Sequence, residues 1–139
     1  MEHNDILVIG IGGAGGRLVD ALAARAPEAV RTAMIDTDAA ALAASQAVSK
    51  LQIGSHVTNG QGTGGDAGLA RRAATDDAEI IRGLFSDARL VVVLAGLGGG
   101  TGSAVTPEVI KAAGLSGTPT LCVATQPFSF EGAPRAALA

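Results

Sequence analysis

The run Gly98-Gly99-Gly100-Thr101-Gly102-Ser103 sets the expected architecture of this chain. It follows an apolar stretch, 90–97, that is typical of a buried strand, and it precedes an alanine-rich stretch, 104–113, that is typical of a helix. In such a turn, glycines let backbone N–H groups approach an anion closely, and the helix N-terminus adds partial positive charge. Thr101 and Ser103 add hydroxyl donors. The run therefore predicts a phosphate-binding loop.

A second glycine-rich turn has the same setting. Gly10-Ile11-Gly12-Gly13-Ala14-Gly15-Gly16 follows an apolar run, 6–9, and opens an expected helix over 15–26 that Pro27 would stop. Its first six residues fit the Gly-x-Gly-x-x-Gly pattern of dinucleotide-binding folds, although some of these glycines could instead allow a helix to pack closely on a strand. Two such loops at two strand ends predict one nucleotide held from both sides.

The composition favours a parallel sheet covered by helices. The 139 residues suffice for one domain, 47% of them are hydrophobic and only 2% are aromatic, so the core must be aliphatic. The net charge is −3 without a basic patch, which argues against a nucleic-acid partner. No apolar run approaches the ~18 residues that a membrane helix needs, and no secretory signal opens the chain. We therefore expect a cytoplasmic protein without a membrane partner.

Cysteine and histidine usage gives little sign of chemistry. Cys122 is the only cysteine, which excludes a disulfide framework, and its apolar surroundings predict a buried small hydrophobe rather than a nucleophile. His3 and His56 lack metal-ligand spacing, and we interpret both as facing solvent. The sequence thus predicts no metal site built from cysteine or histidine.

Strand and helix patterns alternate along the chain. Residues 58–68 contain five glycines and are expected to form a flexible loop. Right-handed crossovers then give a doubly wound, mostly parallel, Rossmann-like α/β sheet of order 3-2-1-4-5 with helices on both faces, and ligands bind where strands one and four meet. The expected strands are 6–9, 32–35, 51–53, 90–94 and 120–125, and the expected helices are 15–26, 39–47, 69–85 and 104–113, with a last helical turn from 134.

Carboxylates lie close to the expected loops. Asp36 and Asp38 end the second strand, where a dinucleotide fold places its ribose-binding acid; capping of the next helix is an equal alternative for Asp38. No lysine follows either glycine loop, since Lys50 and Lys111 are the only lysines. Phosphate binding would then rest on amides, hydroxyls and a hydrated Mg²⁺, which Asp36, Asp38 and Asp66 could help to hold.

Five motifs, in order, resemble the N-terminal GTPase domain of the tubulin/FtsZ superfamily, and within it the bacterial cell-division proteins. The resemblance is collinear over essentially the whole chain and implies one nucleotide-binding domain over 1–139 with GTP or GDP as its ligand. The motifs are Gly12–Gly16, Asp36-Thr37-Asp38-Ala39 with Leu42, Gln52-Ile53-Gly54 with Thr58, Gly60, Gly62 and Gly64, Gly98–Ser103, and Thr125–Gly132.

The resemblance also implies roles for individual residues. The two glycine loops would hold the phosphates, with the γ-phosphate near Gly62 and Gly64. Glu131 would accept hydrogen bonds from the ribose, and Arg135 would lie along the base or ribose. The expected nucleotide-binding residues are Gly12, Gly13, Ala14, Arg17, Asp36, Asp38, Gly62, Gly64, Gly98, Gly99, Gly100, Thr101, Gly102, Ser103, Glu131 and Arg135.

Several departures from the family pattern matter. Arg17 stands where the family usually has a nucleotide-contacting asparagine, Asp66 replaces another asparagine, and Ala67 replaces a proline. An aspartate beside the γ-phosphate adds repulsion unless a cation intervenes. The family's base-binding helix, catalytic loop and C-terminal domain lie beyond the resembling region, which reaches Ala139. We therefore expect an incomplete domain with no catalytic residue of its own, which binds nucleotide but hydrolyses it negligibly.

Three functions remain open at this point. The first is the nucleotide-binding domain of a cytoskeletal GTPase that assembles filaments; the resemblance implies a role in cell division. The second is a non-catalytic module that caps or tunes filaments of a full-length partner. The third is an NAD-binding Rossmann domain, which the second glycine loop disfavours. An apolar edge strand at 120–125 predicts self-association or docking on a full-length subunit of the same family.

Overall fold

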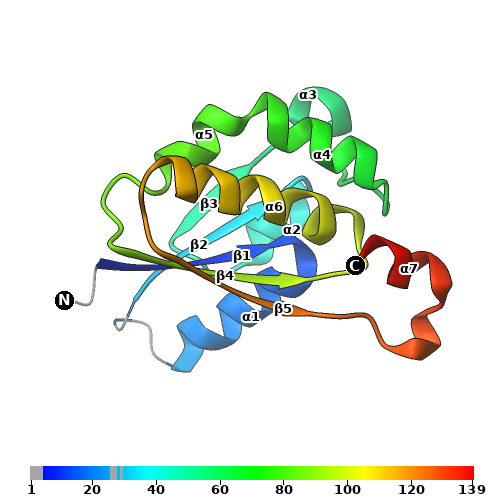
Figure 1. Ribbon diagram of the computed structural model, residues 1–139, viewed down its shortest axis with the longest axis horizontal. Coiled ribbons are helices and arrows are strands. Elements are labelled where there is room, and N and C mark those ends of the chain that lie inside the picture. The colour runs from blue at the N-terminus through cyan, green and yellow to red at the C-terminus, as the bar shows by residue number, and fades with distance from the viewer. Residues whose placement is uncertain (1–4, 26–27, 29) are drawn as a thin grey trace.

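The computed structural model describes residues 5–25, 28 and 30–139 and is an α/β sandwich built on one parallel sheet (Figure 1). In the described part of the chain the sheet has five strands in the order β3-β2-β1-β4-β5, and every neighbouring pair is parallel. The predicted order 3-2-1-4-5 is therefore confirmed. The strands are β1 (Ile6–Ile11), β2 (Arg31–Asp36), β3 (Ser49–Gln52), β4 (Leu90–Gly96) and β5 (Thr120–Thr125).

Helices cover both faces of this sheet. Figure 1 shows α1 on one face and α4, α5 and α6 on the other, with α7 projecting beyond the end of the sheet. The sequence patterns placed the starts of two helices too late, because α1 and α6 begin within the glycine turns themselves. The helices are α1 (Gly12–Arg25), α2 (Ala39–Ala44), α3 (Ser55–Thr58), α4 (Ala67–Asp76), α5 (Ala78–Gly83), α6 (Gly100–Leu115) and α7 (Ala133–Leu138), with a 3-10 turn η2 (Ser129–Glu131) before α7.

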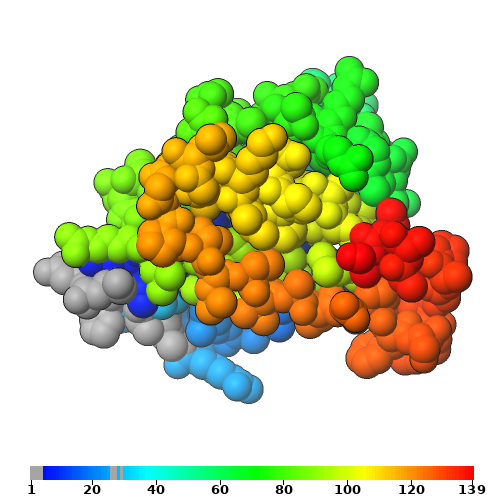
Figure 2. Space-filling view, viewed as in Figure 1, coloured from blue at the N-terminus to red at the C-terminus, as the bar shows by residue number. Residues whose placement is uncertain are grey.

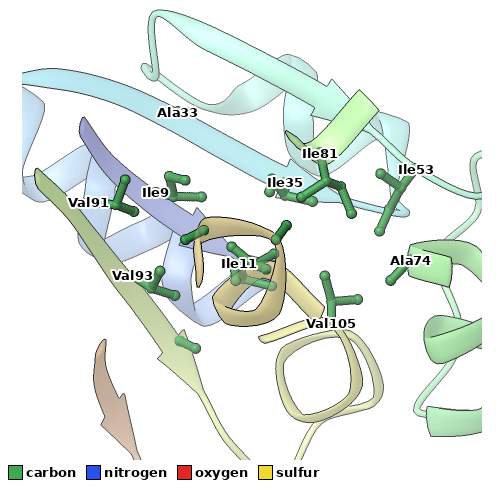
Figure 3. Close-up of a cluster of buried hydrophobic side chains, with 14 of the residues drawn as sticks. Ile9, Ile11, Ala33, Ile35, Ile53, Ala74, Ile81, Val91, Val93 and Val105 are labelled. Carbon is green, nitrogen blue, oxygen red and sulfur yellow. The ribbon is translucent and has the colours of Figure 1, made fainter. Parts of the chain in front are cut away.

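The core is aliphatic as the composition predicts, with one exception among the described residues, the buried aromatic side chain of Phe85. Because strand side chains alternate between faces, β1 contributes Ile9 and Ile11 to the cluster under α6 and Val8 to the cluster under α1. Figure 3 shows the first cluster, in which Ile35 and Val93 pack toward Val105 of α6. No described helix is long and apolar enough to cross a bilayer.

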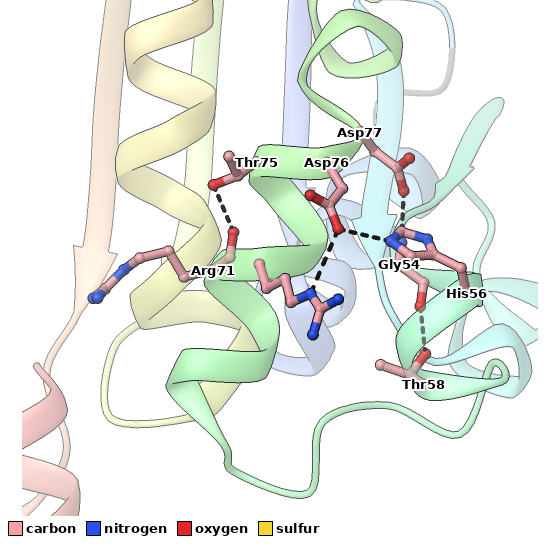
Figure 4. Close-up of polar contacts among 8 residues, drawn as sticks. Gly54, His56, Thr58, Arg71, Thr75, Asp76 and Asp77 are labelled. Carbon is pink, nitrogen blue, oxygen red and sulfur yellow. Dashed lines mark hydrogen bonds and ion pairs between the residues drawn. The ribbon is translucent and has the colours of Figure 1, made fainter.

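The predicted helix 69–85 is wrong, since the chain forms α4 and α5 with a break at Asp77. The carboxylate of Asp77 accepts a hydrogen bond from the N–H of Gly54 at 2.7 Å (Figure 4), which ties the break to the turn before α3. The break also changes which side chains face the core. Ile81 is buried, whereas its neighbour Ile80 is 53% exposed.

Two further predictions concern single side chains. Cys122 is exposed, not buried, because β5 is the edge strand and its side chains from 121 to 125 are all exposed. His56 is largely exposed, as predicted, and its Nε2 lies 2.8 Å from the Asp76 carboxylate (Figure 4). His3 and Pro27 lie outside the described residues.

Candidate functional site

A cleft of about 770 Å³ opens where the carboxyl ends of the strands converge. Its lining includes the last residues of β1, β2 and β5, namely Ile11, Asp36 and Thr125, and Gly96 at the end of β4. Ligands of open parallel sheets bind at this edge, at the point where the strand order reverses. The cleft lies there, between β1 and β4.

The N-termini of two helices meet at the cleft. Gly12, the first residue of α1, has a φ of +72°, which favours glycine, and a Cβ placed on it would lie 3.3 Å from the Gly102 nitrogen in the first turn of α6. Both helix starts therefore present unpaired backbone N–H groups from adjacent positions. Two such ends side by side form an anion-binding surface with two sets of donors.

A cluster of threonine hydroxyls joins three loops at the cleft. The Oγ1 atoms of Thr37 and Thr101 lie 3.2 Å apart, and Thr63 Oγ1 lies 3.5 Å from that of Thr101. Thr37 is fully buried. The cluster links the loop after β2, the glycine-rich loop before α4 and the start of α6. It therefore helps to fix the positions of these three segments relative to one another.

Asp36 is a buried carboxylate at the end of β2. Its Oδ1 accepts hydrogen bonds from the N–H groups of Thr37 at 2.7 Å and Asp38 at 3.2 Å. Burial raises the pKa of Asp36 above its ordinary value; the two backbone hydrogen bonds oppose this shift, and the charge of Asp38 adds to it. The charged form of Asp36 therefore costs stability in the folded chain.

We expect Asp36→Asn to raise the melting temperature of the ligand-free chain at neutral pH. The amide keeps an oxygen that accepts from Thr37 and Asp38 but carries no charge. Because the folded pKa is raised, the penalty of ionised Asp36 is present above that pKa and disappears below the unfolded value of about 3.9, where both states are protonated. Melting curves of both proteins should converge as the pH falls toward 4, and a difference that is independent of pH would contradict this assignment.

The other two candidate magnesium ligands are occupied by backbone groups. Asp38 Oδ1 accepts from Ala40 N at 2.9 Å and caps α2, so its capping role is real, while Asp38 also lines the cleft. Asp66 accepts from Leu69 N at 3.0 Å and caps α4. Among the described residues no three acidic, histidine or cysteine side chains are placed to hold a metal. The described residues therefore do not form a site that could hold Mg²⁺ by protein ligands alone.

The segment after β5 forms one wall of the cleft. Glu131 Oε2 accepts a hydrogen bond from Phe128 N at 2.6 Å, and Glu131 Oε1 lies 3.7 Å from Arg135 Nη1. Both charged residues line the cleft, and so does Phe128. The expected ribose acceptor and its neighbouring arginine therefore form an ion pair at the cleft edge.

The structure brings together fourteen of the sixteen expected site residues and leaves Gly98 and Ser103 outside the lining. Gly98 has a φ of +101° and its N–H donates to Ser103 Oγ at 2.8 Å. This pair therefore stabilises the loop conformation without lining the cleft. The sequence could have placed Thr37 and Thr63 in the cleft lining, since each lies between two residues that were expected to line it. The expected set omitted Thr37, Thr125, Gln126, Pro127 and Phe128, although all five lie in motifs that carry the family resemblance. It also omitted Ile11, Ala41, Gln61, Thr63, Gly65, Gly96 and Leu97.

The fold and the cleft define a doubly wound α/β domain with a cleft at the carboxyl ends of its strands, and comparison with known proteins identifies its family. The profile of the Tubulin/FtsZ family, GTPase domain, matches residues 5–139. The chain therefore belongs to the Tubulin/FtsZ family.

Relatives from this family are similar over nearly the whole chain. Cell division protein FtsZ of Buchnera aphidicola subsp. Baizongia pistaciae is 40% identical over 136 residues, which are 97% of this chain and 35% of the relative. The structure of an empty FtsZ dimer from M. jannaschii superposes with a TM-score of 0.91 at 36% identity, covering 97% of this chain and 39% of that one. CetZ2 from Haloferax volcanii, in a GTPgS-bound protofilament, superposes with a TM-score of 0.85 at 31% identity. That match covers 94% of this chain and 42% of the CetZ2 chain. The chain thus spans about a third of the length of the curated relatives it matches.

Proposed function

We propose that this chain binds GTP or GDP in the cleft, as the nucleotide-binding part of an FtsZ-type cytoskeletal GTPase that acts in the cytoplasm during cell division. The observation that carries the proposal is the meeting of the α1 and α6 N-termini beside the threonine cluster. This arrangement offers amides and hydroxyls to a phosphate chain without a lysine. Membership of a GTPase-domain family supports guanine as the base.

In this proposal, different residues of the cleft contact the phosphates, the ribose and the base. The phosphates lie against the first turns of α1 and α6, with Gly62 and Gly64 beside the terminal phosphate. Thr101 donates its hydroxyl to a phosphate oxygen. Glu131 accepts from the ribose hydroxyls, and the neighbouring Arg135 lies along the ribose or base.

Isothermal titration calorimetry with GTP, GDP, ATP and NAD tests this proposal. We expect heat of binding with both guanine nucleotides and much weaker binding of ATP and NAD. Tight binding of NAD without binding of GTP would instead favour the dinucleotide-binding alternative. Both outcomes are read on the same purified chain under one buffer condition.

We also propose a partner, a second FtsZ-type subunit that is either a copy of this chain or a longer relative. The support is the exposed apolar surface of β5 and the segment after it, where Leu121 is 56%, Val123 48% and Phe130 82% exposed. Figure 2 shows this segment and α7 as a projection at one end of the molecule. The relatives' structures include an FtsZ dimer and a CetZ2 protofilament.

Cys122 provides a direct probe of this surface because it is exposed on β5. We expect its thiol to react rapidly with a disulfide reagent in dilute solution and more slowly as the chain concentration rises or when polymerising FtsZ is added. Light scattering of that FtsZ should fall when the chain is present. Equal Cys122 reactivity under all conditions, with unchanged scattering, would contradict the partner proposal.

A further inference from the structure

Arg17 lies one helical turn after Gly13, on the exposed side of α1. Helical side chains lean toward the N-terminus of their helix, so Arg17, the sixth residue of α1, can reach back over the first turn. The coordinates show this arrangement: Arg17 Nη1 lies 3.7 Å from the position that a Cβ on Gly13 would take. The guanidinium therefore sits over the first glycine loop, inside the lining of the cleft.

The charges around the cleft single out Arg17. The lining contains the carboxylates of Asp36, Asp38 and Glu131, and two cations, Arg17 and Arg135. Arg135 already has a partner, since its Nη1 lies 3.7 Å from Glu131 Oε1. Arg17, by contrast, makes no ion pair and no side-chain hydrogen bond with any residue that the structure describes. It is the cation that remains available to an anionic ligand.

We propose that Arg17 is the counter-charge for the nucleotide phosphates and that it makes the site prefer longer phosphate chains. The inference rests on the proposed function and adds a selectivity to it. The planar guanidinium can donate two parallel hydrogen bonds to one phosphate, while the amides at the start of α1 donate to the same chain. Without Arg17, the lining would oppose the phosphates with three carboxylates and a single, already paired arginine.

The test compares Arg17→Ala and Arg17→Lys with a matched control, Arg25→Ala, an exposed arginine at the other end of α1. Affinities for GTP, GDP and GMP are measured, together with binding of inorganic tripolyphosphate. We expect Arg17→Ala to weaken GTP binding roughly tenfold or more, GDP less and GMP least, since a hydrogen-bonded charge pair contributes about that factor. Arg17→Lys should recover part of the loss, and Arg25→Ala should show none.

Each outcome has one meaning. Equal losses for GTP, GDP and GMP would place Arg17 on the base or ribose and overturn the inference, as would unchanged affinities. If the parent chain binds no guanine nucleotide but binds tripolyphosphate through Arg17, the proposed function fails, and what stands of the inference is the role of Arg17 as a counter-charge for a polyphosphate. If neither ligand binds, both fail. Melting temperatures of the three variants show whether a loss reflects unfolding.

Discussion

Gly100→Ala is expected to weaken GTP binding roughly 100-fold, because the phosphate would lose well-placed hydrogen bonds from loop amides. Gly100 is buried at the start of α6, and a Cβ there would lie 2.7 Å from Thr63 Oγ1 and 2.8 Å from the carbonyl carbon of Gly65. Either the loop before α4 or the first turn of α6 must move, and both line the cleft. Titration calorimetry measures the affinity.

The fold should survive this change, since Gly65 and Asp66 are exposed and their turn can shift outward. Gly114→Ala is the matched control in the same helix, where a Cβ meets nothing within 4 Å. Because alanine favours helix over glycine, we expect this control to stabilise the chain by up to about 1 kcal/mol and to keep full affinity. Unchanged affinity in Gly100→Ala would show that the first turn of α6 does not contact the ligand.

Gly15→Ala is expected to lower the free energy of unfolding by about 3 kcal/mol or more, which is the upper range for overpacking a core. A Cβ on Gly15 would overlap the carbonyl oxygen of Leu94 in β4 and lie 3.1 Å from the carbonyl carbon of Gly10 in β1. Both obstacles are backbone atoms of central strands, so they cannot turn aside as a side chain would. Chemical denaturation followed by circular dichroism measures the loss.

Gly13→Ala separates packing from ligand contact in the same glycine run. A Cβ on Gly13 meets only Arg17 Nη1, at 3.7 Å. We therefore expect normal stability and weaker nucleotide binding for this variant, the reverse of the Gly15→Ala profile. A stable Gly15→Ala protein would mean that α1 does not pack on β1 and β4 as closely as described.

The sheet could be predicted because its signals are local. Unbroken apolar strands followed by glycine turns mark β1 and β4, and the short crossovers leave few topologies. Contacts between distant segments account for the errors. The break between α4 and α5 depends on the bond from Gly54 to Asp77, and the exposure of Cys122 depends on β5 being an edge strand. No periodicity in either segment contains that information.

The cleft was predictable for a similar reason, since both glycine loops follow strands that are neighbours in the sheet. The sequence could not predict which role each glycine has. Gly15 lets α1 pack closely on β1 and β4, Gly98 shapes its loop, and Gly12 borders the start of α6. These roles depend on atoms that are far away in sequence. The contacts that Thr37 and Thr63 make with Thr101 could not be predicted, because the three hydroxyls meet only through tertiary structure.

Equilibrium dialysis against GDP tests the central claim most directly. The chain contains no tryptophan, no tyrosine and three phenylalanines, so the base absorbs in the ultraviolet almost without interference from protein. We predict an excess of GDP on the protein side that approaches one nucleotide per chain. Because GTP absorbs at the same wavelength, the competition with excess GTP is read after the two nucleotides are separated by ion exchange, and the GDP excess should then disappear. If no excess appears at about 1 mM GDP, the binding free energy is less favourable than about −4 kcal/mol. That result would contradict the assignment of this cleft as a guanine-nucleotide site.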